Sequence, residues 1–209
     1  IAILKSGEPS IVSNAIFDGL SGIRRGDWYT TGAVTSFQSE ITIKDCIFRN
    51  ITSEDALNIF DSKFHLVGSR FEQTRSDAVD LDFSNLKIKS LNINGAKNDC
   101  VDFSFGNYDI TKAVVNRCGD KGLSVGEKSK ANLKNVLITE SKIGVASKDS
   151  SVTTIDQISM NKLEICLSAY KKKKEFNGST MRVKRFSCDN FYKKIDKDDL
   201  SDIFIESEI

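Results

Sequence analysis

The chain has 209 residues, of which 39% are hydrophobic and 28% are charged, so it is long enough for one globular domain with a substantial core. Its 30 Lys and Arg residues balance 29 Asp and Glu residues, which excludes the strong positive field typical of nucleic-acid-binding proteins. No apolar run approaches the length of a transmembrane span, so we expect neither a nucleic-acid partner nor membrane insertion.

The chain begins "IAILKSGEPS", with neither an initiator Met nor a signal peptide, and we expect it to be a fragment of a longer protein with further domains.

The N-terminal part contains an insertion, the segment "LSGIRRGDWYTTG", which includes Arg24, Arg25, Trp28 and Tyr29. Such a loop can stack aromatic rings on sugars while arginines bind carboxylate or sulfate. The alternative is that Trp28 covers the open end of the core.

From Ile41 onward, three columns of apolar residues recur at steps of 22 or 23. The first column consists of Leu57, Val79, Val101, Leu123, Val145 and Leu167. The second consists of Ile43, Leu66, Ile88, Ile110, Leu133 and Ile155. The third consists of Phe48, Phe71, Ile93, Val115, Ile138 and Met160. Because the second and third columns share their one-residue insertions, we interpret them as equivalent positions on successive coils of a solenoid.

The segments around these columns alternate in polarity, as in "SEITIKDCIF" and "SKFHLVGSRF", which predicts short strands. Three strands per repeat predict an all-β fold, a right-handed single-stranded parallel β-helix of about seven to eight coils of ~22 residues. We expect residues 1–209 to form a single domain. The repeat breaks near the end, so residues 190–209 are predicted to be a C-terminal cap or tail.

Two stretches, "SDAVDLDFSN" and "NDCVDFSFGN", place acidic residues between apolar ones. Strand alternation makes Asp80 and Asp102 face outward one coil apart, with Asp82 a strand step away. Ser124 continues the first outward row, and Tyr170 lies further along the row of Asp82. Adjacent like charges on a ladder are destabilising, so we expect a cation, a shared proton or nearby lysines to compensate. The candidate lysines are Lys121, Lys128 and Lys148.

Both acidic rows have a structural alternative. The outward row could be solvated surface charge that discourages lateral aggregation. A second row lies in the turn before the strand and consists of Asp55, Asp77, Asp99 and Lys121. Aspartate side chains in turns commonly accept hydrogen bonds from nearby backbone N–H groups, so this row can have a structural role.

A second insertion, between Ala169 and Val183, contains "KKKKEFNG". It is either a solvated basic turn or an anion contact. The two insertions lie about six coils apart and frame roughly 29 Å of exposed strand face, which is long enough for an extended polymer. We predict that both flank the same face.

The five cysteines are an odd number and show no CxxC pairing. They are Cys46, Cys100, Cys118, Cys166 and Cys188. This pattern favours buried free thiols over a disulfide framework or a zinc site.

The repeats "ITIKDCIFRNITSEDALNIF", "ITKAVVNRCGDKGLSVGEKS" and "LKNVLITESKIGVASKDSS" resemble those of right-handed parallel β-helix proteins of the pectate-lyase-like superfamily. The resemblance covers residues 41–170. It implies a carbohydrate context, with the protein outside the cell or in the cell envelope, although the cysteine usage leaves a cytoplasmic location open. The sequence has neither the Gly-His-Gly nor the Arg-Ile-Lys motif of polygalacturonases.

These observations predict a carbohydrate-associated module that binds, and can process, an extended acidic polysaccharide along an outer strand face. A lyase would hold Ca²⁺ on Asp80, Asp82 and Asp102 and use Lys121, Lys128 or Lys148 as the base. A glycoside hydrolase would use two of the carboxyl groups. The expected substrate contacts are Trp28, Tyr29, Arg24, Arg25, Ser124 and Tyr170. The alternative is a noncatalytic structural or adhesin-like spacer domain of a larger surface protein.

Overall fold

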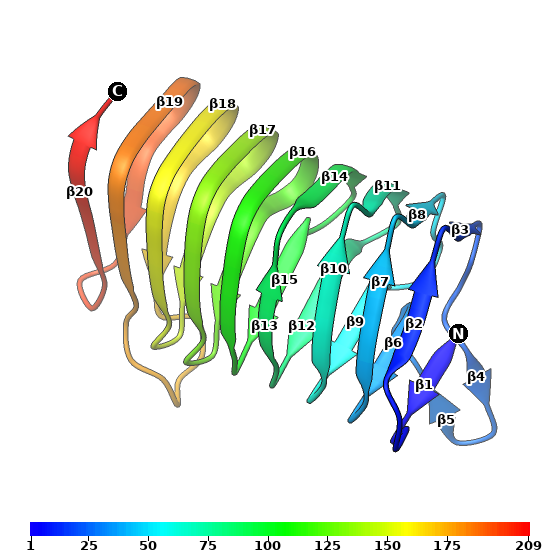
Figure 1. The fold of residues 1–209 in the computed structure, drawn as a ribbon. Helices are drawn as coiled ribbons and strands as arrows, with labels where there is room; N and C mark the ends of the chain where they lie inside the picture. The colour runs from blue at the N-terminus through cyan, green and yellow to red at the C-terminus, as the bar shows by residue number, and fades with distance from the viewer.

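The computed structural model describes all 209 residues as an all-β solenoid of about eight coils of roughly 22 residues, with no helix. Successive coils stack along one axis, and the two termini lie at opposite ends of the stack (Figure 1). Strands of neighbouring coils pair in parallel at the predicted steps, as in Val79↔Val101 and Leu66↔Ile88. The predicted parallel β-helix is therefore confirmed.

Each coil contributes to three strand faces. Face 1 begins with β1 (Ala2–Leu4), β6 (Gly32–Phe37), β9 (Asp55–Phe60), β12 (Asp77–Asp82) and β15 (Val101–Ser104). Face 2 contains β2 (Ser10–Ser13), β7 (Glu40–Lys44), β10 (Lys63–Val67) and β13 (Asn85–Ile88), and face 3 contains β3 (Ile16–Asp18), β8 (Ile47–Arg49), β11 (Arg70–Thr74) and β14 (Leu91–Ala96). Four long strands then pass through faces 2, 3 and 1 in turn: β16 (Asn107–Gly126), β17 (Lys130–Lys148), β18 (Val152–Tyr170) and β19 (Thr180–Lys197).

The last strand, β20 (Asp202–Glu208), pairs in parallel with β19, with Met181 opposite Ile203 and Val183 opposite Ile205. Both partners are 22 residues apart, so this part of the tail resumes the repeat where the sequence was expected to break it. The irregular step lies upstream, in the insertion after Tyr170.

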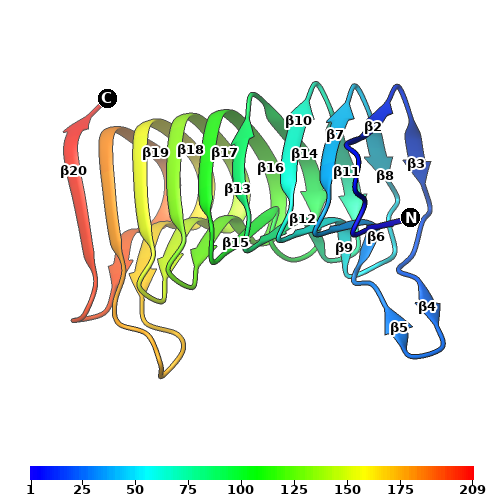
Figure 2. The ribbon, with the colours of Figure 1, turned by 60° about the horizontal axis from the view of Figure 1, so that its bottom comes forward.

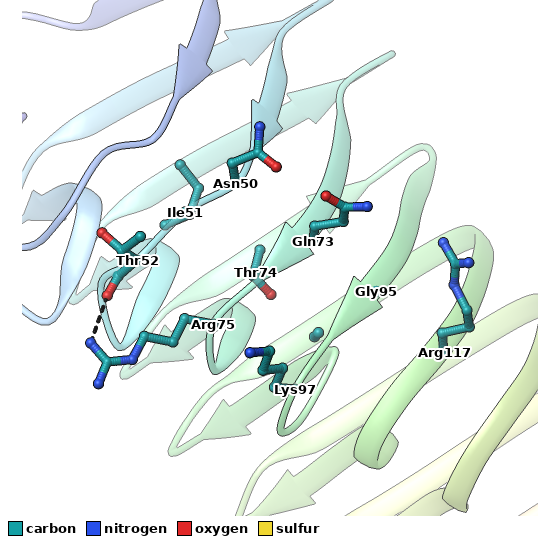
Figure 3. Close-up of a pocket in the computed structure, with 10 residues that line it drawn as sticks. Asn50, Ile51, Thr52, Gln73, Thr74, Arg75, Gly95, Lys97 and Arg117 are labelled. Carbon is teal, nitrogen blue, oxygen red and sulfur yellow. Dashed lines mark hydrogen bonds between the residues drawn. The ribbon is translucent and has the colours of Figure 1, made fainter.

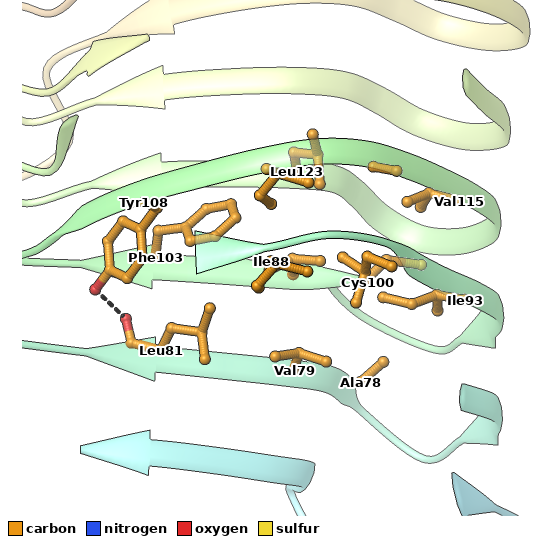
Figure 4. Packing of buried hydrophobic residues seen from close by; sticks show 14 of the residues in the cluster. Ala78, Val79, Leu81, Ile88, Ile93, Cys100, Phe103, Tyr108, Val115 and Leu123 are labelled. Atoms are coloured by element: carbon orange, nitrogen blue, oxygen red, sulfur yellow. Dashed lines mark hydrogen bonds between the residues drawn. The ribbon is translucent and has the colours of Figure 1, made fainter. Parts of the chain in front are cut away.

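The three apolar columns form the core. All eighteen positions are buried, and they belong to one cluster of 46 buried residues (Figure 4). Phe48 in this core stacks on Phe17 at 4.5 Å and on Phe71 at 4.6 Å between ring centroids. Because the same side chain type recurs one coil away, each ring packs on its own equivalent.

A ladder of buried serines satisfies the backbone at the turn between faces 1 and 2. The Ser84 hydroxyl accepts a hydrogen bond from the Ser62 N–H of the preceding coil and donates to Asp82 O. Gly106 occupies the next serine position, and the Tyr108 hydroxyl takes over there by donating to Ser104 O at 2.8 Å. Tyr108 is fully buried, and its hydroxyl also lies 2.8 Å from Leu81 O (Figure 4).

The two insertions project from the same side of the solenoid (Figure 2). The first forms a hairpin of β4 (Arg24–Arg25) and β5 (Trp28–Tyr29), and the second is the loop at residues 171–178. Both lie on the side of face 1, near opposite ends of the stack of coils (Figures 1 and 2). The prediction that they flank one face is therefore confirmed.

The prediction of free thiols is wrong for four of the five cysteines. Cys100 is bonded to Cys118 and Cys166 is bonded to Cys188, while Cys46 is free and buried. In the strand ladder Cys118 lies opposite Ala96 and Cys188 lies opposite Met160. Each disulfide thus joins residues at different ladder positions, across the corner between faces 3 and 1, which is why column arithmetic does not reveal the pairs.

Candidate functional site

The acidic row lies on face 1 in the predicted register. Asp80 pairs with Asp102, Asn58 lies on one side of this pair, and Ser124 lies on the other. Asp82 lies opposite Ser104. Asp80, Asp82 and Asp102 therefore come together on two adjacent strands, and we call this group the acidic patch.

The row is covered more than alternation predicts. Ser124 is fully buried although its side chain points out of the barrel, and Ser168 is buried too. Lys148 starts two coils beyond Asp102 and folds back over Gly126, on the strand of Ser124, to reach Asp102. A Cβ on Gly126 would lie 2.7 Å from Lys148 Cε, so the glycine leaves the space through which the lysine side chain passes. The outer row is therefore partly buried around Ser124 and is not simply solvated surface charge.

Lys148 and Asp102 form an ion pair with 3.5 Å between Nζ and Oδ1. The Lys148 side chain is 4% exposed and that of Asp102 is 26% exposed. At this distance the contact is an ion pair rather than a strong hydrogen bond. Asp102 Oδ1, which faces Lys148, and the Ser124 hydroxyl are buried and have no hydrogen-bond partner within the protein. The ion pair with Lys148 is therefore the only compensation of the Asp102 charge within the patch.

Asp80 and Asp82 share a different environment. Burial raises the pKa of Asp80 to about 9, and the neighbouring charge of Asp82 acts in the same direction. Burial also raises the pKa of Asp82, to about 6, with the charge of Asp102 contributing. Asn58 Nδ2 donates a hydrogen bond to Asp80 Oδ2 at 3.1 Å. Because burial raises the pKa of Asp80 so far, Asp80 keeps a proton at neutral pH.

The calcium site on Asp80, Asp82 and Asp102 stays a prediction. No group of three or more His, Cys, Asp or Glu side chains is positioned to hold a metal ion in this arrangement. Without a metal, burial keeps a proton on Asp80, and Asp102 faces the Lys148 ammonium. The charges of the patch are compensated by a proton and a lysine, two of the three means that the sequence leaves open.

The turn row of aspartates is structural. The Asp77 carboxylate accepts hydrogen bonds from Asn98 Nδ2 and from the Asp99 N–H of the next coil. Asp99 in turn accepts from the Lys121 N–H and lies 3.3 Å from Lys121 Nζ, which also contacts Asp120. Burial acts to lower the pKa of Lys121, but its contacts with Asp120 and Asp99 outweigh burial and raise that pKa. Lys121 is therefore held in the turn row and does not reach the acidic patch.

Lys128 also lies away from the acidic patch. Its ammonium lies over the ring of Phe176, 5.9 Å from the centroid, within reach of a cation–π interaction. The loop at residues 171–178 is anchored nearby, because Lys173 pairs with Glu127 at 2.7 Å and Glu127 accepts from the Ser104 hydroxyl at 2.7 Å. Burial acts to raise the pKa of Glu127, but the hydrogen bonds from Lys173 and Ser104 outweigh burial, so the pKa of Glu127 is lowered. The loop thus forms a wall beside the patch.

The predicted substrate contacts fall into two groups. Ser124 and the half-buried Tyr170 lie on face 1, and burial raises the pKa of Tyr170 although Lys121 and Lys148 act to lower it. The hairpin residues Arg24, Arg25, Trp28 and Tyr29 are all exposed, with Trp28 at 58%. Trp28 therefore does not cover the core. Face 1 separates the hairpin from the loop at residues 171–178 (Figure 2).

Four phenylalanines beside the acidic patch were not predicted as a site. Ring centroids are 5.2 Å apart for Phe37 and Phe60, 5.1 Å for Phe60 and Phe83, and 4.6 Å for Phe83 and Phe105. Phe83 is 46% exposed and Phe105 is 39% exposed. We call this row the aromatic strip, and it ends against Phe176 of the wall, 6.0 Å away. The steps of 23, 23 and 22 between its members are a fourth column that the sequence does contain.

The strip changes ladder position halfway. Phe37 and Phe60 end their strands, whereas Phe83 and Phe105 stand one residue later, where Asp82 and Ser104 take the strand position. Phe83 and Phe105 have φ of +51° and +53°, a conformation that bulky residues rarely adopt. Gln38 and Asp61 have φ of +47° and +44° at the equivalent positions of earlier coils, so this conformation belongs to the turn between faces 1 and 2.

No family model matches this sequence, and no curated protein or solved structure matches it either.

Proposed function

We propose that this protein binds an extended polysaccharide along face 1, with sugar rings on the aromatic strip and hydroxyl groups on the acidic patch. One observation carries the proposal: a continuous row of stacked, partly exposed phenylalanines runs beside partly buried carboxyl groups. Because the rings stack on one another, the strip presents their apolar edges, against which the apolar C–H face of a sugar can pack, and carboxyl groups accept hydrogen bonds from sugar hydroxyls. This is the chemistry of a glycan site.

The spacing of the strip suits a polymer. Stacked coils lie about 4.8 Å apart, close to the length of one sugar unit in an extended chain, so successive rings can meet successive phenylalanines. The wall at residues 171–178 and the hairpin at residues 24–29 limit the face at its two ends. A polymer of several units therefore fits between them.

The charged groups on and beside face 1 favour neutral and acidic sugars at different places. The patch contributes three aspartates against one lysine, so it favours hydroxyl groups over carboxylates. Arg24 and Arg25 on the hairpin and Lys171, Lys172 and Lys174 in the wall are the groups that would hold the carboxylate of a uronate. An acidic polysaccharide would then also contact the basic residues of the hairpin and the wall, whereas a neutral one would contact the aromatic strip alone.

Binding to neutral and uronate polysaccharides tests the proposal. Phe83→Ala/Phe105→Ala should weaken binding of the best ligand by roughly tenfold, since each stacking contact contributes about 0.5–1.5 kcal/mol. Phe204→Ala removes a phenylalanine of similar exposure on β20, away from face 1, and should leave affinity within twofold. Equal effects of the two changes, or no polysaccharide bound by the wild type, would refute the glycan site.

Glycoside hydrolysis is a second candidate, and the pairing of Asp80 with Asp102 favours it, because strands about 4.8 Å apart bring the two carboxyl groups near the separation of a retaining pair. Burial raises the pKa of Asp80, as a general acid requires. Asp80 would donate its proton to the leaving oxygen, and Asp102 would act as the nucleophile. Release of reducing ends from the bound polysaccharide, abolished by Asp80→Asn with binding retained, would support this role. Binding without any release would leave the protein a noncatalytic module.

The context fits an extracellular or cell-envelope protein. Two disulfides are typical of oxidising compartments, and the parallel β-helix is the fold of the pectate-lyase-like superfamily, to which the repeats bear a resemblance. The structure contains no helix long and apolar enough to cross a membrane. An adhesin-like spacer shares the fold and compartment, but it would not need the exposed aromatic strip.

A further inference from the structure

A separate groove runs across the coils at the corner where face 3 ends and the turn toward face 1 begins. It has a volume of about 600 Å³, within the range of small-ligand sites. Its floor is formed by the buried Ile51, Thr74 and Ala96. Asn50, Gln73 and Arg117 lie along one side, and Thr52, Arg75 and Lys97 along the other (Figure 3).

Gly95 opens the groove. It stands between Gln73 and Arg117 in the row of turn residues, and its φ of +102° is one that a side chain would strain. Because the position has no side chain, the space between the two walls stays open at the coil of Lys97 (Figure 3).

Three cations line this groove without a carboxylate partner. Arg75, Lys97 and Arg117 are exposed and form no salt bridge, and Arg75 makes only one hydrogen bond, to Thr52 O at 3.3 Å. Arg75 and Lys97 stand on adjacent coils about 4.8 Å apart, where like charges are unfavourable unless an anion lies between them. The remaining donors of both guanidinium groups are free.

The acidic groups nearby are already engaged. Asp18 pairs with Arg49, and Glu72 pairs with Arg70, each at 2.9 Å. Asp77 and Asp99, which follow Arg75 and Lys97 in sequence, accept the hydrogen bonds of the turn row. The groove therefore keeps its positive charge.

We propose that this corner groove binds an oxyanion of the sulfate or phosphate type, held by Arg75, Lys97 and Arg117. Planar guanidinium groups bind such oxygens in pairs, and Asn50, Gln73 and Thr52 supply further polar contacts. The oxyanion is either a free ion or a substituent on a polysaccharide. The groove lies on a different corner from the aromatic strip, so it is independent of the glycan site proposed for face 1.

Titration calorimetry with dextran sulfate, unsulfated dextran and inorganic sulfate tests the site at about 50 mM salt. Dextran sulfate should bind and dextran should not bind in the groove. The variant Arg75→Gln/Lys97→Gln/Arg117→Gln should weaken sulfate-dependent binding at least tenfold. The control variant Lys87→Gln/Lys89→Gln/Lys134→Gln makes the same change in net charge with exposed lysines outside the groove, and it should change affinity less than twofold.

The outcomes separate the sources of the anion. Binding of inorganic sulfate with no gain from the polymer identifies a free ion, and much tighter binding of dextran sulfate identifies a sulfated chain; both support the groove. Equal losses in the two triple variants, no loss in either, or a wild type that binds neither probe would overturn it. Phe83→Ala/Phe105→Ala should leave sulfate-dependent binding intact, so this site and the glycan site fail separately.

Discussion

The Lys148 ammonium lies 3.5 Å from the carboxylate of Asp102, two coils away along the solenoid. The lysine side chain crosses the intervening coil over Gly126, where any Cβ would stand in its path. A long-range ion pair of this kind ties three coils together on the face that carries the acidic patch. It also places a positive charge beside carboxyl groups that would otherwise repel one another.

Replacing Lys148 should destabilise the fold through Asp102. Removing one partner of a fully buried ion pair costs about 3–5 kcal/mol, and because a quarter of the Asp102 side chain is exposed we expect about 1–3 kcal/mol for Lys148→Met. The further change Asp102→Asn should recover most of this loss. Lys162→Met breaks the exposed Lys162–Glu140 pair and should cost less than about 1 kcal/mol. Urea unfolding of the four proteins measures these differences, and equal costs for the two lysines would contradict the buried pair.

Stability should fall as pH rises from 5 to 8.5. The folded-state pKa of Asp80 is about 9, far above its unfolded value near 4, so the folded protein binds more protons throughout this window. The free energy of unfolding therefore decreases as pH rises. Burial also raises the pKa of Asp55 to about 7 and that of Asp77 to about 6, and both add to the same trend. Thermal unfolding across this range should show a declining melting temperature.

The variant Asp80→Asn isolates the contribution of Asp80. Asparagine stays neutral at every pH, so the variant should be more stable than the wild type at pH 8.5 and should show a shallower decline. Asp27→Asn, at an exposed hairpin residue, should leave the slope unchanged. A wild type that becomes more stable toward pH 8.5 would show that the carboxyl groups of face 1 ionise freely.

The sequence was sufficient to predict the fold because a β-helix repeats its contacts at a fixed interval. Val79 and Val101 are neighbours in space because each coil takes 22 residues, and the same repeat length aligns the residues of all three columns. The register of Asp80 on Asp102 could be predicted by the same argument. The burial of that row could not, since it depends on the path of Lys148 over Gly126.

Features that change ladder position were missed. Phe60 and Phe83 stack although one ends a strand and the other begins a turn, so a column counted at one position does not join them. The bonded pair Cys166 and Cys188 lies 22 residues apart but is not a pair of equivalent positions, because the insertion after Tyr170 lengthens that coil. Spacing alone does not determine such contacts.

The two disulfides should be detectable by counting thiols. Alkylation of the denatured protein without reductant should modify one cysteine, Cys46, and after reduction it should modify all five. The bonds span 18 and 22 residues, for which the loss of each is expected to cost about 3 kcal/mol. Cys166→Ser/Cys188→Ser should therefore lower the melting temperature by several degrees. Five modified cysteines before reduction would contradict the bonds.

Tyr108 should be one of the most sensitive polar residues in the core. Its hydroxyl replaces the serine that Gly106 lacks and lies 2.8 Å from both Ser104 O and Leu81 O. Tyr108→Phe keeps the ring but removes a buried hydrogen bond, at a cost of about 0.5–1.5 kcal/mol in the free energy of unfolding. Tyr192→Phe is the matched control, because Tyr192 is 90% exposed and should cost almost nothing. If the two changes destabilised the protein equally in urea, the Tyr108 hydroxyl could not be the substitute for the missing serine, and the ladder of turn serines would have to tolerate a gap at Gly106.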